Sequence, residues 1–255
     1  MSRLITAAAA FALLAASQVL QAEMVAETVT YTHDDTAFEG YIAYNRSLGN
    51  RQPTVLIVHD WDGLGEYERT RARMLAREGY TAFAIDLFGA GVRPEAIERR
   101  RELTNALYAD RDQMRTLVDA AMDAAFNHRA TDIAEIVAIG YCFGGAVVLE
   151  MARAGMSLEG FVSFHGGLGT PKDQNYSRVQ GDLLILHGSN DAVAPMEDVV
   201  TLTKALDAES VDYRVEIYGG ARHAFSDWEA EERYDPAADL QSWQALRTFL
   251  NKTLN

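Results

Sequence analysis

The order of hydrophobic and polar residues predicts strands and helices that alternate along the chain. Residues 28–33 and 40–45 alternate between apolar and polar positions, which is typical of an antiparallel hairpin. Later strands are predicted from short, largely apolar runs, which indicate strands buried on both faces of a sheet. These runs cover residues 55–58, 81–85, 136–139, 161–164, 183–186 and 215–218.

Helical periodicity appears between most of these strands. Apolar residues recur at helical spacing in segments at about residues 66–78, 114–126, 144–151 and 237–250. The alternation predicts an α/β fold with a mostly parallel central sheet, helices on both faces and an antiparallel N-terminal hairpin at one edge. This length suits one large core, so we expect residues 23–255 to form a single domain.

The first 22 residues predict a secretory signal peptide. Arg3 precedes an apolar run over residues 4–16, and Ala22 provides a small residue where a signal peptidase would cut. An uncleaved membrane anchor is the alternative, but the run is shorter than the ~20 residues that span a bilayer. We therefore expect a secreted or periplasmic protein with no membrane contact beyond export.

Charge and cysteine content exclude several classes of function. The net charge is −14, from 37 acidic and 23 basic residues, and such a surface disfavours nucleic-acid binding. The chain has one cysteine and six scattered histidines, so it predicts neither a disulfide nor a structural zinc site. We expect no metal, no cofactor and a monomer.

The single cysteine lies at the centre of a distinctive motif, Gly140-Tyr141-Cys142-Phe143-Gly144. A predicted strand precedes the motif and a predicted helix follows it, which is the context of a nucleophile elbow. This turn is strained, and glycines on either side let neighbouring backbone pack closely. A lone cysteine is more often a small buried hydrophobe. The motif favours the nucleophile.

A cysteine nucleophile needs a base, and the base needs an orienting carboxylate. In this fold class the nucleophile, the acid and the histidine follow one another in that order along the chain. Asp191 follows the strand at 183–186, and His223 follows the strand at 215–218. Ordinary turn chemistry for Asp191 and surface exposure for His223 are the alternatives. The order favours Cys142, Asp191 and His223 as a triad.

The residues beside the nucleophile predict the oxyanion hole and the pocket. One donor is the backbone N–H of Phe143, directly after the nucleophile. The second comes from the loop after the strand at 55–58, and Trp61 is the preferred residue. The side chain of Trp61 could instead form a hydrophobic pocket wall. Tyr141 flanks the thiol and is expected to shape the substrate pocket.

The chain resembles the dienelactone hydrolase family of α/β-hydrolases. The resemblance rests on the elbow motif, on His187-Gly188-x-x-Asp191-x-x-x-Pro195 and on Tyr218-x-x-Ala221-x-His223-Ala224-Phe225. It implies a triad of Cys142, His223 and Asp191 that opens lactones or cleaves esters without metal or cofactor. It also implies that Asp60, where the family has glutamate, lies in the pocket beside the resting thiol.

One departure from the family concerns the substrate. Dienelactone hydrolases hold the substrate carboxylate with arginines, and one of these positions is Asp227 here. Arg93 or Arg222 could replace it, although a surface position is the simpler interpretation of each. The leading hypothesis is hydrolysis of a small ester or lactone through an acyl-thioester. The alternatives are a general aryl or carboxylesterase and a non-catalytic periplasmic binding or thiol redox-sensing protein.

Overall fold

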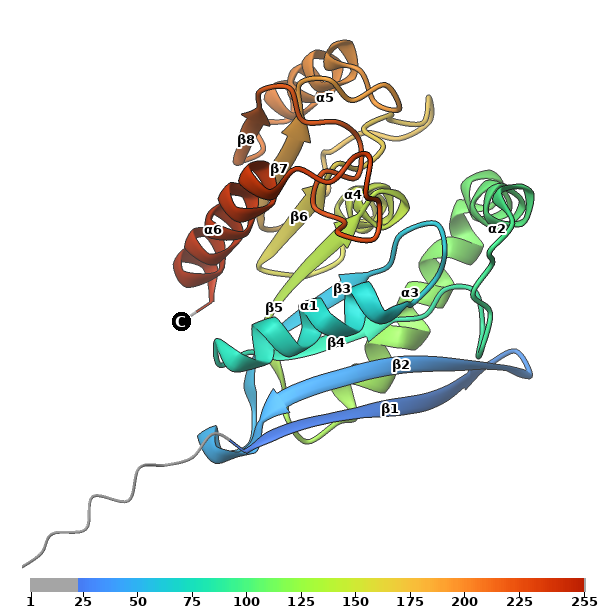
Figure 1. Ribbon diagram of the computed structural model, residues 1–255, viewed down its shortest axis with the longest axis vertical. Coiled ribbons are helices and arrows are strands. Elements are labelled where there is room, and N and C mark those ends of the chain that lie inside the picture. The colour runs from blue at the N-terminus through green and yellow to red at the C-terminus, as the bar shows by residue number, and fades with distance from the viewer. Residues whose placement is uncertain (1–22, 255) are drawn as a thin grey trace, which may run out of the picture.

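Eight strands form one mixed sheet at the centre of the computed structural model, which describes residues 23–254 (Figure 1). The strand order is β1-β2-β4-β3-β5-β6-β7-β8, antiparallel from β1 to β4 and parallel beyond. The strands are β1 Met24–His33, β2 Thr36–Asn45, β3 Gln52–Val58, β4 Thr81–Ile85, β5 Thr131–Tyr141, β6 Gly160–Phe164, β7 Asp182–Gly188 and β8 Tyr213–Tyr218.

Helices cover both faces of this sheet. Helices α1 and α6 pack on one face, and α3, α4 and α5 pack on the other, with α2 beside α3 (Figure 1). Their bounds are α1 Glu66–Arg77, α2 Ile97–Ala109, α3 Arg111–Phe126, α4 Phe143–Ala154, α5 Met196–Ala208 and α6 Pro236–Thr253, with a short 3₁₀ turn η1 at Arg46–Leu48.

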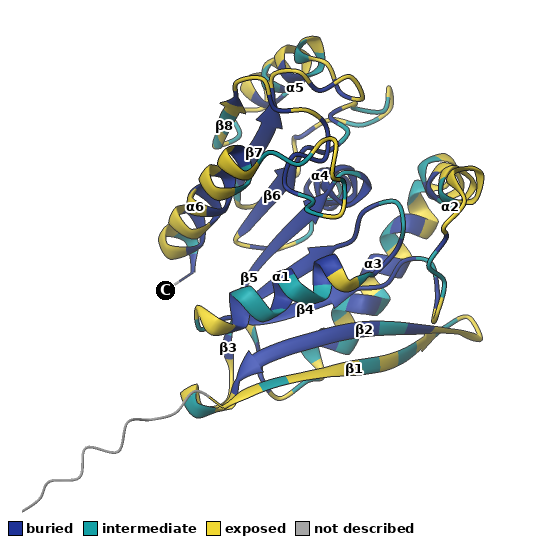
Figure 2. Ribbon diagram, in the orientation of Figure 1, coloured by how far each residue is buried: buried dark blue, intermediate teal, exposed yellow. Residues whose placement is uncertain are grey.

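Alternation along the strands divides the core into two layers. In β3, Val55 and Ile57 pack toward α1 and α6, whereas Leu56 and Val58 pack toward α3 and α4. The central strands are buried on both faces, while β1 is largely exposed at the edge (Figure 2). This burial explains why the central strands read as continuous apolar runs and the edge hairpin reads as an alternating pattern.

The predicted fold class is confirmed, and the main differences concern boundaries. Strand β5 begins at Thr131, before the apolar run at 136–139, because its first half carries polar and exposed residues. The predicted signal peptide lies outside the described residues. Within residues 23–254, no helix is both long enough and apolar enough to cross a membrane.

The turn between β5 and α4 packs closely against β3. Cys142 adopts a φ of 51°, and the glycines around it leave room for neighbouring backbone. A Cβ on Gly144 would overlap the carbonyl oxygen of Val58, and a Cβ on Gly140 would overlap the carbonyl oxygen of Gly144. The motif therefore needs both glycines, because backbone atoms fill the space that a side chain would take.

Substitution at Gly144 tests this close packing. We expect Gly144→Ala to lower the free energy of unfolding by about 3 kcal/mol or more, because the new methyl group would have to displace backbone of a central strand. Gly167→Ala is the matched control, since its Cβ would lie at an ordinary 3.6 Å from the Ala146 Cβ. Denaturant unfolding measures both, and equal midpoints for the two variants would contradict the interpretation.

Candidate active site

Cys142, Asp191 and His223 meet at the carboxyl end of the parallel strands. They lie in the turns after β5, β7 and β8, respectively. His223 Nε2 is 3.0 Å from Cys142 Sγ, and His223 Nδ1 is 2.8 Å from Asp191 Oδ2. The structure therefore brings together the three residues that the sequence proposed as a triad, in hydrogen-bond contact with one another.

The backbone of Cys142 is held by two acceptors. Its N–H donates to the carbonyl oxygen of Phe164 at 3.0 Å and to Nδ1 of His165 at 3.2 Å. A positive φ is unusual for a residue with a side chain and has to be stabilised by its surroundings. These bonds and the glycine contacts hold the thiol at the N-terminal end of α4.

The carboxylate of Asp191 is anchored by its own turn. Oδ1 accepts from the N–H groups of Val193 at 2.8 Å and Ala194 at 2.9 Å, which leaves Oδ2 for His223. Burial acts to raise the pKa of Asp191, but these hydrogen bonds and His223 outweigh it, so the pKa is lowered. Asp191 is thus ionised at neutral pH and can orient His223 by accepting from Nδ1.

The thiol of Cys142 is neutral in this arrangement. Burial and the nearby Asp60 carboxyl raise its pKa well above the ordinary value. The backbone N–H of Phe143 lowers the pKa only in part. A thiolate therefore has to be generated by transfer of the proton to a base rather than by spontaneous ionisation.

Two buried side chains orient the loop after β3. His59 Nε2 accepts from Leu87 N, so Nδ1 carries the proton and donates to the Asp60 carbonyl oxygen at 2.5 Å. Because a trans peptide points its N–H away from its C=O, the N–H of Trp61 faces the opposite side, where it donates to the Asp60 carboxylate. The predicted second oxyanion donor is therefore occupied by Asp60.

Glu68 fixes the rest of this loop. Its two carboxyl oxygens accept from the N–H groups of Asp60 at 3.3 Å and Gly65 at 2.8 Å. Burial and the neighbouring acidic groups raise the pKa of Glu68 to about 8 and that of Asp60 to about 6. Sequence reasoning missed Glu68, because a glutamate in the first turn of an amphipathic helix reads as an ordinary surface residue.

Tyr141 does not line the pocket, in contrast to the prediction. Its side chain is fully buried on the α1 and α6 face, with ring centroids 5.0 Å from Tyr67 and 4.7 Å from Phe164. Side chains alternate along β5, which directs Tyr141 into the core. Phe143 lies on the other face of the sheet, among the aromatic rings of Phe88 and Tyr108.

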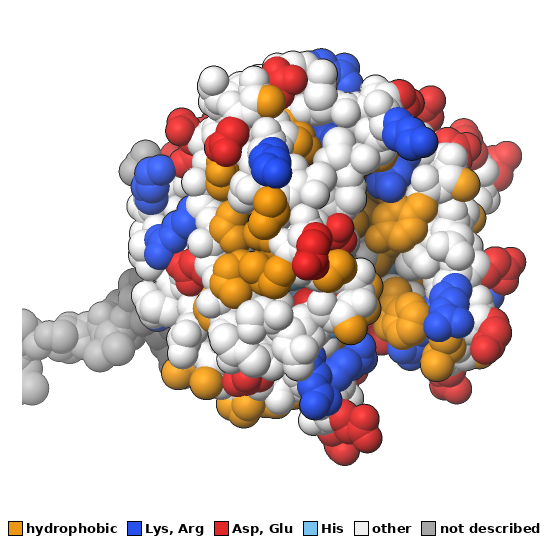
Figure 3. All heavy atoms as spheres, turned by 90° about the horizontal axis from the view of Figure 1, so that it is seen from above, with side chains coloured by type: hydrophobic (Ala, Val, Ile, Leu, Met, Phe, Trp, Pro, Cys, Tyr) orange, Lys and Arg blue, Asp and Glu red, His pale blue; other side chains and the backbone are white. Residues whose placement is uncertain are grey.

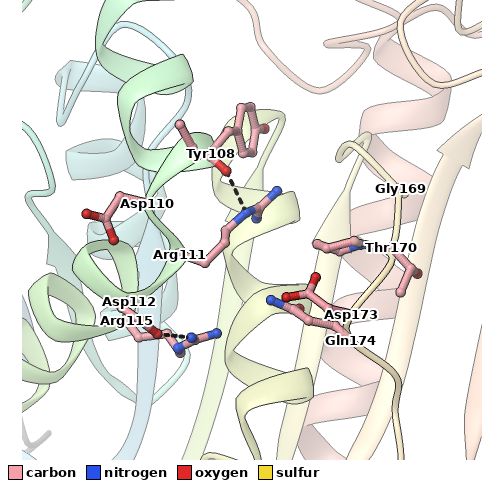
Figure 4. A pocket seen from close by; sticks show the side chains of 11 residues that line it. Tyr108, Asp110, Arg111, Asp112, Arg115, Gly169, Thr170, Asp173 and Gln174 are labelled. Atoms are coloured by element: carbon pink, nitrogen blue, oxygen red, sulfur yellow. Dashed lines mark hydrogen bonds and ion pairs between the residues drawn. The ribbon is translucent and has the colours of Figure 1, made fainter.

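A cavity of about 600 Å³ lies beside this aromatic group rather than over the thiol. Figure 4 shows Tyr108 and Arg111 on one side and the loop at 169–174 on the other. Neither Cys142 nor His223 lines it. Tyr108 connects the cavity to the site, because its ring centroid lies 5.5 Å from that of Phe143. Burial raises the pKa of Tyr108, and the neighbouring Cys142 acts in the same direction.

Several acidic groups lie near Asp62, whose charge also raises the pKa of Asp60, and Arg233 is the basic group that acts on both Cys142 and Asp227. Burial and the charge of Asp62 raise the pKa of Asp227, and Asp227 in turn raises that of Glu229. Seen from above, hydrophobic patches alternate with acidic and basic groups (Figure 3). The two arginines considered as replacements are otherwise engaged: Arg93 donates to the carbonyl oxygens of Leu64 and Val92, and exposed Arg222 donates to that of Glu232.

The side chains of the described residues form no cluster suited to a metal. Within residues 23–254, no group of three or more His, Cys, Asp or Glu side chains is arranged to hold an ion.

Comparison with known proteins identifies the family. The family model described as "Dienelactone hydrolase family" matches residues 38–254. A Synechocystis protein, provisionally named as a carboxymethylenebutenolidase, is 28% identical over 243 residues, which cover 89% of this chain and 96% of the relative.

Solved structures agree with this match. The protein designated m3DLH is 33% identical, with a TM-score of 0.86 over 91% of this chain and 99% of that one. A dienelactone hydrolase-like promiscuous phosphotriesterase from metagenomic libraries is 30% identical, with a TM-score of 0.85 over 92% of this chain and all of that one (100%). This chain therefore belongs to the dienelactone hydrolase family and is a hydrolase of small-molecule substrates.

Proposed function

We propose that the protein hydrolyses small esters or lactones by covalent catalysis, with Cys142 as nucleophile, His223 as general base and acid, and Asp191 as the orienting carboxylate. The observation that carries the proposal is the pair of contacts made by His223, 3.0 Å to the sulfur and 2.8 Å to the carboxylate. Both distances suit proton transfer along a hydrogen bond.

The first half-reaction forms an acyl-thioester. As Sγ of Cys142 bonds to the substrate carbonyl carbon, its proton passes to Nε2 of His223. The carbonyl oxygen becomes an oxyanion, which the N–H groups of Phe143 and Trp61 stabilise; each such donor is worth about 10²–10³ in rate. His223 then gives the proton to the leaving alcohol oxygen, and the carbon–oxygen bond breaks.

The second half-reaction restores the enzyme. His223 takes a proton from a water molecule, whose oxygen attacks the thioester carbonyl carbon. The carbon–sulfur bond then breaks, the acid leaves and His223 returns the proton to the sulfur. Asp191 accepts from Nδ1 of His223 throughout and stabilises the imidazolium that forms in each half-reaction.

Asp60 gives this site a protected resting state. Its carboxyl group accepts from the Trp61 N–H and raises the pKa of the Cys142 thiol, so it occupies one oxyanion donor and keeps the nucleophile neutral. A substrate carbonyl oxygen must displace it from Trp61 before the oxyanion can bind there. A free thiol that is kept neutral reacts slowly with oxidants, which suits the exported protein that we propose.

The chemistry of the thiol favours activated substrates. A tetrahedral adduct expels its better leaving group, so aryl esters, enol lactones and thioesters proceed whereas simple alkyl esters revert to thiolate and substrate. The acidic group of Asp62, Asp227 and Glu229, which adjoins Asp60, further favours neutral substrates over anionic ones. An aryl or carboxylesterase that has no dedicated lactone substrate fits the same geometry. Because one similar structure is named as a phosphotriesterase, aryl phosphotriesters are also worth testing as substrates.

Substitution of the triad tests the mechanism. We expect Cys142→Ala and His223→Ala to lower kcat/KM for a 4-nitrophenyl ester about 10³-fold or more, because either change removes a group that acts in the transition state. Alkylation of the single cysteine should abolish turnover in the same way. His33→Ala, in the edge hairpin, is the control and should retain activity.

Undiminished turnover in Cys142→Ala would exclude the mechanism. A thiol that oxidises reversibly in a protein without ester turnover would favour a redox sensor.

Removal of the Asp60 charge should activate the thiol. Above its pKa of about 6, Asp60 is ionised and raises the pKa of Cys142; below it, the protonated carboxyl exerts no such charge effect. Iodoacetamide should therefore alkylate Asp60→Asn several-fold faster than the wild type at pH 8, because the thiolate fraction rises when the charge is removed, with the difference shrinking below pH ~6. Glu159→Gln, which removes one exposed negative charge just before β6, is the control and should be alkylated at the wild-type rate. Equal rates in wild type and Asp60→Asn at pH 8 would contradict this role.

The acidic approach predicts selectivity against negative charge. We expect a neutral 4-nitrophenyl ester to be hydrolysed with higher kcat/KM than its hemisuccinate analogue at low ionic strength, and salt to narrow the gap because it screens charge over about 10 Å at 0.1 M. Asp227→Asn should raise kcat/KM for the anionic substrate by a few-fold. Glu159→Gln, at an exposed position just before β6 and thus at the amino end of the parallel strands, should leave kcat/KM for the anionic substrate unchanged. A salt-independent preference would show that charge does not set selectivity.

A further inference from the structure

A chain of buried polar side chains lies behind the triad, where the surrounding core is apolar. It consists of His165, Ser226, Tyr67 and Arg71, and all four side chains are fully or almost fully buried. His165 Nε2 is 2.8 Å from Ser226 Oγ, and Ser226 Oγ is 2.9 Å from the Tyr67 hydroxyl. Buried polar groups are costly unless each finds a partner, so a connected chain of them invites a functional explanation.

The partners fix the direction of every hydrogen bond in this chain. His165 Nδ1 accepts from the N–H of Cys142, so the proton of the neutral ring is on Nε2 and is donated to Ser226 Oγ. Ser226 then donates to the Tyr67 oxygen, which also accepts from Arg71 Nε at 3.2 Å. Tyr67 completes the set by donating to the Ser226 carbonyl oxygen at 3.2 Å.

Arg71 anchors the far end. Its guanidinium donates to the Ser226 carbonyl oxygen at 2.9 Å and pairs with Asp239 at 2.5 Å in α6. The side chain is only 1% exposed, and the rings of Tyr67, Trp228 and Trp243 lie within about 5 Å of the guanidinium carbon. A buried cation held by carboxylate, carbonyl and aromatic faces has one favourable position, so it forms a rigid anchor.

Ser226 connects Arg71 to the turns that carry Cys142 and His223. Through its hydroxyl it holds His165, which accepts from the strained backbone N–H of Cys142. Through its carbonyl it fixes the turn that begins with His223, three residues earlier in the chain. The nucleophile and the base come from separate strands, β5 and β8, and this chain links the turns that follow them.

We infer that Ser226, through His165 on one side and Tyr67 and Arg71 on the other, is a positioning residue that sets the distance and alignment between Cys142 Sγ and His223 Nε2. The inference rests on the proposed function, since it assigns a role within that reaction. None of the four side chains need touch the substrate. Their effect is therefore expected in kcat and in thiol reactivity rather than in KM.

The experiment compares Ser226→Ala with the wild type, by ester turnover per reactive thiol and by the rate of alkylation with iodoacetamide. We expect kcat to fall roughly 10- to 100-fold, because a misplacement of about 1 Å costs about that much, with KM changed less than about threefold. Alkylation should slow in parallel, since His223 is then misaligned as a base. Tyr67→Phe keeps the ring against Arg71 and removes only the hydroxyl, and it should show a smaller loss in the same direction.

Ser242→Ala is the matched control. Ser242 is also fully buried and donates to a backbone carbonyl, that of Asp239 at 2.9 Å, but it has no bond to the triad. It should lower the melting temperature about as much as Ser226→Ala while leaving kcat per reactive thiol unchanged. Retained kcat and alkylation rate in Ser226→Ala, or an equal loss in Ser242→Ala, would overturn the inference.

Two further outcomes separate this inference from the proposed function. If the wild type hydrolyses no ester but Ser226→Ala still slows alkylation relative to Ser242→Ala, the proposed reaction fails and the positioning role stands. If Ser226→Ala does not fold, Tyr67→Phe decides by the same criteria: a lowered kcat or alkylation rate supports the inference, and unchanged values overturn it.

Discussion

The close crossing of backbone at the turn after β5 is the constraint on which the rest of the site depends. Gly140 and Gly144 let this turn lie directly against β3, so Cys142 can adopt a φ of 51° at the start of α4. That placement directs the thiol toward the carboxyl edge of the sheet, where the turns after β7 and β8 bring Asp191 and His223. The sheet holds the three turns in register, because neighbouring parallel strands end at the same edge.

The acidic groups around the triad differ in the net shift of their pKa, although burial acts to raise the pKa of each. Asp191 is ionised because His223 and two backbone N–H groups outweigh the cost of burial. Asp60 and Glu68 receive less compensation, so their pKa values rise to about 6 and about 8. In the proposed mechanism, Asp191 thus orients His223 as the base, while Asp60 occupies the Trp61 N–H. The difference arises from hydrogen bonds rather than from residue type.

Family membership and the local departures from the family together define the proposed chemistry. The elbow, the acid and the histidine occur in the order expected for dienelactone hydrolases, and the match extends over residues 38–254. Asp227 replaces an arginine that the resemblance would require for a substrate carboxylate. Arg93, which could have replaced it, binds backbone carbonyls instead. The proposed chemistry therefore combines the family's arrangement of cysteine, histidine and aspartate with a preference for substrates without a carboxylate.

The sequence alone determined the fold class, the position of the elbow between a strand and a helix, and the three residues that meet there. These features follow from local signals: apolar periodicity, glycines at a strained turn and positions at strand ends. Only the tertiary structure decided that Tyr141 points into the core, that Asp60 occupies the Trp61 N–H, and that Arg71, Tyr67, Ser226 and His165 form one buried chain. Arg71 and Ser226 are 155 residues apart, so no local pattern could pair them. Contacts of that kind depend on how α1 and the loop before α6 pack over the sheet, which periodicity does not encode.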